Sequence, residues 1–313
     1  MIVHRVNSDE VRIDAPAKLN LFLEVLNRRP DGFHNINSLF QAVSLFDRLT
    51  FQRRERPGCI LTIAGANGLD SGPANLVCRA YDLMRNRFGF EAGLHVRLEK
   101  NIPVAAGLAG GSSNAAATLL ACNLLGDLGL NDEALRRTGL ELGSDIPFFF
   151  TRGQALVRGR GEILEETDYP TDYSVTLANP GFELSTAAAY AALKRDLTQS
   201  ADPFSLPCCR AVEEFVHFLG LAGNDFERVH LTVHPELREI RDGLLQRGAA
   251  LARMSGSGPT IFGIFTGSPY PLVKESKRWG HWRMDTVAPI TLQTQATNVW
   301  RHRGNHRNKG DVT

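Results

Sequence analysis

Hydrophobic and polar residues alternate in several parts of the chain, which is the pattern of a β-strand with one buried face. The alternation is clearest over residues 11–26, 94–98 and 174–178, with further strand candidates at residues 49–51, 60–63 and 260–265. Residues 154–164 carry several glycines and predict a strand with bends. We therefore expect a long strand, or a pair of strands, near the N-terminus and shorter strands after it.

Other segments repeat their apolar residues at the spacing of a helix. Residues 73–88 do so, and Gly89 predicts the end of that helix. Asn131 or Asp132 predicts the start of a helix that runs to about residue 142, and further helices are expected over residues 186–194 and 210–219. This mixed order of strands and helices favours an α+β fold over a doubly wound sheet. The stretch around Pro170 predicts a domain junction.

Residues 103–123 combine a loop of small residues with a helix rich in Ala and Leu, directly after the strand predicted at 94–98. Ser112 and Ser113 occupy the positions where a helix N-cap is expected. The first N–H groups of a helix have no partner within it, and the helix dipole favours an anion there. The segment therefore predicts a phosphate-binding loop, although a flexible turn before a core helix would show the same pattern.

Three well-known phosphate-binding motifs do not match this loop. No Lys follows the last Gly, as a Walker A loop requires, and the glycine spacing does not fit a dinucleotide fingerprint. The HRD and DFG triplets of protein kinases are also missing from the sequence.

Composition and charge narrow the class of protein. The chain has 313 residues and a net charge of +1, which argues against a nucleic-acid surface as its main function. The N-terminus lacks the pattern of a signal peptide, and no apolar run approaches the ~20 residues that a membrane span needs. The five cysteines contain no CxxC pair and favour reduced thiols in the cytoplasm. His230 and His234 lie four residues apart, but the HExxH motif of a zinc site is absent.

Three further elements carry side chains or loops that could take part in binding or catalysis. Lys18 stands in an otherwise apolar strand, Asp145 begins the apolar run of residues 146–150, and a second Gly/Ser loop spans residues 254–260. Taken singly, each has an ordinary structural reading: a strand lysine that reaches solvent, a turn residue after a helix, and a hairpin.

In combination, these elements resemble the GHMP kinase family. Seven motifs occur in order between about residues 14 and 265, so the resemblance covers most of the chain. They read APAKLNLFLEV, RPDGFHNINSLFQAVSLFD, IPVAAGLAGGSSNAAA, LGSDIPFF, NPGFELSTAAAY, NDFE and ARMSGSGPTIF. The combination is specific, although no single motif is.

The resemblance implies a two-domain α+β kinase with an N-terminal ATP-binding domain over residues 1–166 and a C-terminal domain over residues 167–299. It implies that Lys18 and Asp145 form the catalytic pair beside the acceptor hydroxyl. It also implies an ATP phosphate loop and a pocket for a cytidine diphosphate-linked sugar alcohol. The loop residues are Pro103, Val104, Ala105, Ala106, Gly107, Leu108, Ala109, Gly110, Gly111, Ser112 and Ser113, and the substrate residues are Asn20, Phe33, His34, Thr186 and Tyr190.

The implied reaction is the ATP-dependent phosphorylation of a 2-hydroxyl in the non-mevalonate isoprenoid pathway. Mg²⁺ is expected to neutralise the phosphates, with ligands that the sequence does not identify. We expect no nucleic-acid or membrane partner, and a monomer or weak homodimer. Another GHMP kinase, acting on mevalonate, homoserine or a sugar, and a catalytically inactive nucleotide-binding relative remain as alternatives.

Two features depart from the family pattern. Phe33 stands where a Tyr is usual, which preserves an aromatic face but removes a hydroxyl. The loop reads AAGLAGG, with Ala105, Ala106 and Ala109 in a stretch where more glycines are typical, so an alanine at any position that needs a positive φ would be strained. Because Gly107, Gly110 and Gly111 remain, the loop is expected to keep its shape. The basic segment 300–313 has no counterpart in the family and is expected to be a solvated, disordered tail.

Overall fold

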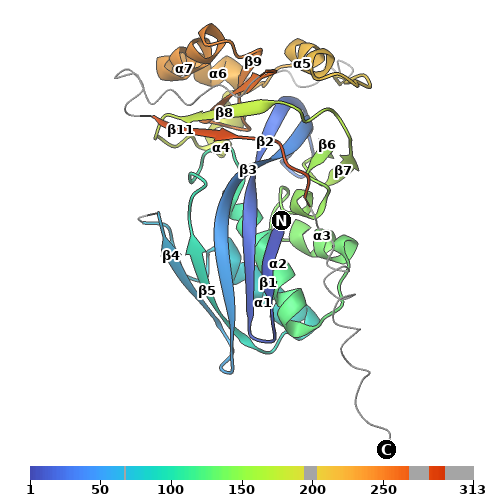
Figure 1. The fold of residues 1–313 in the computed structure, drawn as a ribbon, viewed down its shortest axis with the longest axis vertical. Helices are drawn as coiled ribbons and strands as arrows, with labels where there is room; N and C mark the ends of the chain where they lie inside the picture. The colour runs from blue at the N-terminus through green and yellow to red at the C-terminus, as the bar shows by residue number, and fades with distance from the viewer. Residues whose placement is uncertain (67, 194–202, 268–281, 293–313) are drawn as a thin grey trace, which may run out of the picture.

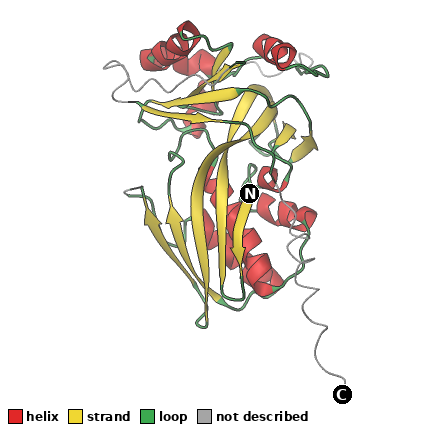
Figure 2. Ribbon diagram, viewed as in Figure 1, coloured by secondary structure: helices red, strands yellow, loops and turns green. Residues whose placement is uncertain are grey.

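The computed structural model describes residues 1–66, 68–193, 203–267 and 282–292. In these residues the chain forms a seven-stranded sheet and a four-stranded sheet, each covered by helices (Figures 1 and 2). The larger sheet has the order β1-β2-β3-β5-β4, with β6 paired to β3 and β7 to β6. Its strands are β1 Ile2–Val6, β2 Glu10–Arg28, β3 His34–Arg54, β4 Cys59–Ala64, β5 Gly93–Glu99, β6 Gln154–Gly159 and β7 Ile163–Glu166.

The smaller sheet has the order β11-β8-β10-β9 and is antiparallel throughout. Its strands are β8 Ser174–Asn179, β9 Leu251–Met254, β10 Ile261–Phe265 and β11 Arg283–Val287. The helices are α1 Leu76–Phe88, α2 Gly110–Gly126, α3 Asp132–Leu140, α4 Thr186–Ala192, α5 Val212–Leu221, α6 Glu227–Val233 and α7 Pro235–Gln246, with a 3-10 turn at Pro147–Phe150.

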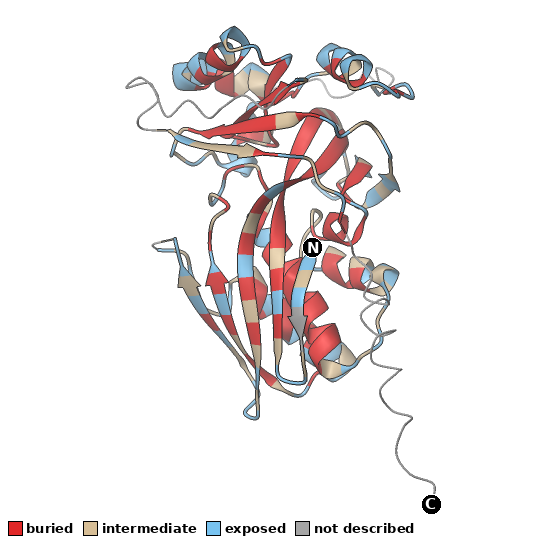
Figure 3. Cartoon of the chain, in the orientation of Figure 1, coloured by how far each residue is buried: buried red, intermediate tan, exposed pale blue. Residues whose placement is uncertain are grey.

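Burial along β2 explains why this strand is so long. Its first residues alternate between buried and partly exposed, as in a strand with one covered face, and then every residue from Ala15 to Leu23 is buried. Leu19 and Leu21 belong to a core that also contains Leu177 and Phe262 of the smaller sheet. The second half of β2 is therefore covered on both faces, and Figure 3 shows it as a continuous buried stretch where the two sheets meet.

Helices α1, α2 and α3 pack on one face of the larger sheet (Figure 2). Nearly every residue of α2 is buried, and small residues such as Ala115, Ala116 and Ala117 let it lie close to β2 and β3. Helix α1 begins at the side-chain cap of Asn75 and ends at Gly89, which adopts the left-handed conformation at φ +68°.

The two sheets are joined by polar contacts as well as by apolar packing. The buried guanidinium of Arg253 on β9 donates hydrogen bonds to the carbonyls of Leu21 on β2 and of Leu219 and Ala222 at the end of α5. Residues 288–292, after β11, also return to the larger sheet, where Ser44 donates to the carbonyl of Ala288. The predicted boundary at residues 166/167 stays a prediction.

Most elements predicted from periodicity are confirmed. The long N-terminal strand, the strands at 94–98, 174–178 and 260–265 and the four helices are present with small shifts of their ends. The single bent strand expected at 154–164 is instead two antiparallel strands, β6 and β7, joined by a turn at residues 160–162. Asn131 is the residue that caps α3, through a hydrogen bond from the Ala134 N–H. The short strand expected at 49–51 is part of the much longer β3, and β1, α6, α7, β9 and β11 were not predicted. The basic tail 300–313 lies outside the described residues.

All five cysteines are free thiols. In the described ranges, no helix has both the length and the apolar composition that crossing a membrane requires.

A buried ion pair holds the segment that leads from β5 into the predicted phosphate loop. Asp47 of β3 is fully buried and lies 2.6 Å from the ammonium of Lys100. The other oxygen of Asp47 accepts hydrogen bonds from the N–H groups of Asn101 and Ile102 at 2.7 and 2.8 Å. The carboxylate thus satisfies one charge and two backbone donors at the start of the loop.

Replacing Asp47 with Ala should lower the free energy of unfolding by about 3–5 kcal/mol, because Lys100 would keep a buried charge without its partner. Urea denaturation followed by circular dichroism measures this change. Asp242→Ala is the control, since its ion pair with Arg241 at 2.9 Å is exposed and is expected to contribute about 1 kcal/mol or less. Equal losses in the two variants would contradict the role given to Asp47.

Candidate active site

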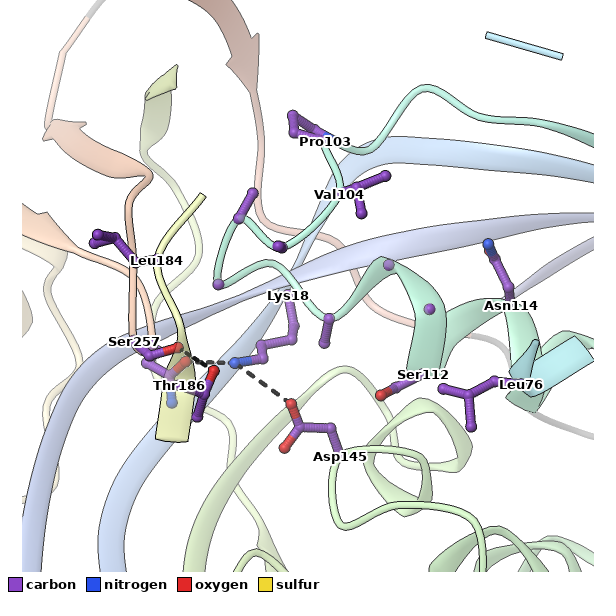
Figure 4. A pocket seen from close by; sticks show the side chains of 18 of the residues that line it. Lys18, Leu76, Pro103, Val104, Ser112, Asn114, Asp145, Leu184, Thr186 and Ser257 are labelled. Carbon is purple, nitrogen blue, oxygen red and sulfur yellow. Dashed lines mark hydrogen bonds and ion pairs between the residues drawn. The ribbon is translucent and has the colours of Figure 1, made fainter. Parts of the chain in front are cut away.

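A cavity of about 600 Å³ lies where β2 and the loop before α2 meet helix α4 and the loop after β9 (Figure 4). Lys18, Asn20, Asp145, Thr186 and Tyr190 line it, as do Pro103–Gly107 and Ala109–Ser112. Of the residues proposed from the sequence, Leu108, Ser113, Phe33 and His34 do not line it. One continuous space therefore joins the predicted phosphate loop to the predicted acceptor residues.

The loop before α2 takes its shape from three residues with positive φ. Gly107 has φ +73°, and the alanines at 105 and 109 have φ +49° and +54°. An alanine in this region is strained by about 1–2 kcal/mol, so the expected strain is present at two of the three alanines of the loop and not at Ala106. The loop keeps its shape because surrounding contacts hold it: Ser255 donates to the carbonyl of Gly107 and Lys18 donates its N–H to that of Leu108.

The prediction that Ser112 or Ser113 caps α2 is wrong. The helix begins at Gly110, its N-cap is Ala109, and no side chain caps it. The first intrahelical bond runs from the Ser113 N–H to the carbonyl of Ala109 at 3.0 Å. In the described part of the chain, the N–H groups of Gly110, Gly111 and Ser112 have no acceptor, so they are available to an anion.

Lys18 projects from the buried part of β2 toward Asp145, which lies in the turn after α3. Its ammonium is 3.8 Å from a carboxylate oxygen of Asp145, contacts the amide oxygen of Asn20, and lies 4.5 Å from the centre of the Phe40 ring. Burial lowers the pKa of Lys18, and the charge of Asp145 acts against that shift. Lys18 is 4 % exposed whereas the Asp145 side chain is 35 % exposed, so the carboxylate is the member of the pair that a ligand reaches.

Ser255, in the loop after β9, joins the two halves of the site. Its hydroxyl accepts a hydrogen bond from the Asn20 N–H at 3.2 Å and donates to the carbonyl of Gly107 at 2.9 Å. The Asn224 amide donates to the carbonyls of Met254 and Gly256, at 2.8 Å each, and so fixes the same loop. β2, the phosphate loop and residues 254–260 are therefore held in one arrangement.

Of the predicted substrate residues, Asn20, Thr186 and Tyr190 line the cavity, whereas Phe33 and His34 lie beside it. Tyr190 on α4 stacks on the imidazole of His34, with ring centres 4.9 Å apart and planes 14° apart, and meets the edge of Phe226. The hydroxyl of Thr186 lies 2.8 Å from that of Ser257 (Figure 4). Phe33 is 51 % exposed and carries the guanidinium of Arg160 on its face at 5.2 Å. His34 and Tyr190 thus contact each other directly instead of facing one another across a gap.

Several cavity residues were not singled out from the sequence. Lys100, Asn114 and Arg160 line the cavity, as do Leu69–Asp70 and Ala74–Leu76 before α1. The amide oxygen of Asn114 is buried and has no hydrogen-bond partner among the described residues. Lys100 could have been suspected, because a charged residue precedes the loop in the motif EKNIP. The others become neighbours only through the folding of distant segments.

Comparison with known proteins agrees with this architecture. The model of the GHMP kinases N terminal domain matches residues 75–153, and that of the GHMP kinases C terminal domain matches residues 190–275. A protein of Syntrophus aciditrophicus named 4-diphosphocytidyl-2-C-methyl-D-erythritol kinase is 44 % identical over 256 residues, which cover 82 % of this chain and 90 % of the relative.

Solved structures share the fold. A crystal structure of 4-(cytidine 5'-diphospho)-2C-methyl-D-erythritol kinase superposes with a TM-score of 0.73 at 33 % identity, covering 89 % of this chain and 99 % of that one. Homoserine kinase from Cytophaga hutchinsonii has a TM-score of 0.67 at 18 % identity, covering 94 % and 99 %, and at that identity the likeness concerns the fold alone. The two domain models and the length of the match to the relatives show that the chain belongs to the GHMP kinase family.

Proposed function

We propose that the chain is an ATP-dependent kinase that phosphorylates the 2-hydroxyl of 4-diphosphocytidyl-2-C-methyl-D-erythritol, a step of the non-mevalonate isoprenoid pathway. The observation that carries the proposal is the single cavity that joins the free N–H groups at the start of α2 to the Lys18–Asp145 pair. The names of the similar proteins support the choice of acceptor.

The donor end of the cavity suits the phosphates of ATP. The N–H groups of Gly110, Gly111 and Ser112 point out of the helix N-terminus, where the dipole also favours negative charge. A Cβ at Gly107 would lie 2.1 Å from the carbonyl oxygen of Ser255, so only glycine allows the loop to pack there. Catalysis of phosphoryl transfer consists mainly of such positioning and charge stabilisation.

At the acceptor end, Asp145 takes or orients the proton of the 2-hydroxyl. Its carboxylate is exposed on the cavity, as a group that receives a proton from a substrate must be. Lys18 holds that carboxylate in place and stabilises the negative charge that develops on the acceptor oxygen. Asn20 and the ring of Phe40 fix the ammonium in turn.

The oxygen donors beside the loop fit Mg²⁺, which is usually bound through one or two carboxylates, waters and the phosphates of the nucleotide. The hydroxyl of Ser112 and the carboxylate of Asp145 both line the cavity (Figure 4). The hydroxyl of Ser112 would contribute a ligand to the ion, which when bound would neutralise charge on the transferred phosphoryl group, whereas Asp145 is left to receive the proton of the acceptor hydroxyl. The described residues contain no cluster of three acidic, His or Cys side chains that would hold a metal by themselves.

The aromatic end suits the cytosine base. Tyr190 offers a ring whose neutral form is favoured, because burial raises its pKa to about 12. His34 offers ring nitrogens for the edge of the base, and burial lowers the pKa of its imidazole. Mevalonate and homoserine have no ring that could stack on Tyr190. The aromatic residues therefore argue against these two compounds as the substrate. Retention of both Lys18 and Asp145 disfavours an inactive nucleotide-binding relative.

The test is ATP consumption by the full-length protein with four acceptors: the cytidine compound, the same sugar alcohol without the nucleotide, mevalonate and homoserine. Turnover should require the cytidine compound. Equal turnover of the unsubstituted sugar alcohol, or preferred turnover of mevalonate or homoserine, would replace the proposed function with that of another GHMP kinase.

Replacing Asp145 with Asn should lower kcat by about 10²–10⁴-fold, because general-base assistance is typically worth that much. Lys18→Ala should cause a loss of similar size, while ATP affinity changes little in both variants. Lys18 acts in its charged form, and burial lowers its pKa. As the pH rises, kcat should therefore begin to fall before the ordinary lysine value of 10.5 is reached, because the ammonium loses its proton. Steady-state kinetics across pH measure both effects, and near-normal kcat in either variant would refute the catalytic assignment.

Gly107→Ala should raise the KM for ATP by about ten-fold or more, because its Cβ would meet the Ser255 carbonyl at 2.1 Å and displace the loop. Gly129→Ala is the matched control: Gly129 also has a positive φ, +67°, but nothing lies within 4 Å of its added Cβ. A similar change in both variants would show that conformational strain, rather than the loop contact, is responsible.

Tyr190→Ala should raise the KM for the cytidine substrate by about ten-fold, since a base stacked on an aromatic ring is typically worth ~1–3 kcal/mol. Tyr190→Phe keeps the ring and should behave like the wild type. The KM for ATP should stay constant in both variants, because Tyr190 belongs to α4 and not to the loop before α2 that is proposed to bind the phosphates. An equal effect of the two substitutions would assign the contribution to the hydroxyl instead of the ring.

A further inference from the structure

Three cationic side chains line the cavity: Lys18, Lys100 and Arg160. The ammonium of Lys18 pairs with Asp145, and that of Lys100 pairs with the buried Asp47. Arg160 forms no ion pair with any carboxylate of the described residues. Its guanidinium therefore has no carboxylate partner at ion-pair distance in the described residues, although its charge also acts on the nearby carboxylate of Asp31, and it remains able to bind an anionic ligand.

The backbone places Arg160 next to the acceptor residues. It lies in the tight turn between β6 and β7, where Gly159 and Gly161 have φ +68° and +121°. A Cβ at Gly161 would come within 3.0 Å of the Ser144 side chain, so the turn packs closely against the residue that precedes Asp145. The backbone N–H of Arg160 also donates a hydrogen bond to the carboxylate of Glu162.

On its other side, Arg160 reaches the aromatic residues at the base-binding end. Its guanidinium lies over the ring of Phe33 at 5.2 Å, and Phe33 is followed by His34, which stacks on Tyr190. Asp31, the acidic side chain of the same loop, is held by Arg29 at 3.0 Å and by the Phe33 N–H at 3.1 Å. Arg160 thus lies between the residues assigned to the acceptor hydroxyl and those assigned to the base.

The proposed substrate has an anionic diphosphate in the corresponding place, between its sugar alcohol and its cytidine. We propose that Arg160 binds this diphosphate and thereby selects a nucleotide-linked acceptor over an uncharged one, an inference that rests on the proposed function. A guanidinium presents a planar set of donors that matches phosphate oxygens, and the Phe33 face supports it by a cation–π contact. Phe33 then acts as the support of Arg160 rather than as a wall for the base.

The test measures binding of two probes, CDP and cytidine, to the full-length protein by calorimetry, with the ATP site filled by a non-hydrolysable ATP analogue. Arg160→Ala should weaken CDP binding by about ten-fold or more and leave cytidine binding unchanged, because only CDP carries the diphosphate. Arg160→Lys should recover part of the loss. Arg158→Ala is the matched control, since Arg158 precedes the same turn, pairs with Glu165 and does not line the cavity.

In kinetics, Arg160→Ala should raise the KM for the cytidine substrate and leave the KM for ATP unchanged. Unchanged CDP affinity, or equal losses for CDP and cytidine, would overturn the inference while wild-type turnover still supports the proposed function. A wild-type protein that neither binds CDP nor phosphorylates the cytidine compound would overturn both.

Discussion

Between Ala15 and Leu23, β2 is buried on both faces, and this burial constrains how the site can be built. A strand in that position contributes apolar side chains to two cores, but it also carries Lys18 and Asn20 into a region with little water. A buried charge is tolerated only with partners. The turn that carries Asp145 must therefore lie where it meets Lys18, and Asn20 must find donors and acceptors of its own, including Ser38 at 3.0 Å.

The same requirement explains the role of the loop after β9. A hydroxyl at Ser255 satisfies the Asn20 N–H and the Gly107 carbonyl together, so the phosphate loop is held by a residue nearly 150 positions away in the chain. Strained residues at the loop, Ala105 and Ala109, persist because these contacts fix their conformation. The donor and acceptor ends are thus positioned relative to each other by the packing of the two sheets.

The sequence correctly predicted those strands and helices that are marked by a pattern within the segment itself. Period-two alternation identified β5 and β8, and Gly89 identified the end of α1. Alternation disappears where both faces are covered, which is why β3 was reduced to residues 49–51. The predicted N-cap of α2, Ser112 or Ser113, was wrong because the helix starts earlier, after Ala109, which takes the left-handed conformation that tertiary contacts impose. Arg160 and Lys100 were missed because their place in the cavity depends on strand pairing between distant segments. Lys18 and Asp145 were singled out from their apolar surroundings in the sequence, but their catalytic role, like the choice of Thr186 and Tyr190, came from the resemblance.

The stack of His34 on Tyr190 has a consequence for selectivity. If Tyr190 binds the base as proposed, the imidazole occupies a ring face that a pyrimidine would use and competes with the incoming base. Separating an aromatic pair costs about 0.5–1.5 kcal/mol, and every ligand of this end must overcome that threshold before a net gain appears. A planar base regains the contact with its own ring, whereas a small aliphatic alcohol regains nothing. Under the proposed function, the His34–Tyr190 stack thus favours ligands with a planar ring, independently of any hydrogen bond to the base.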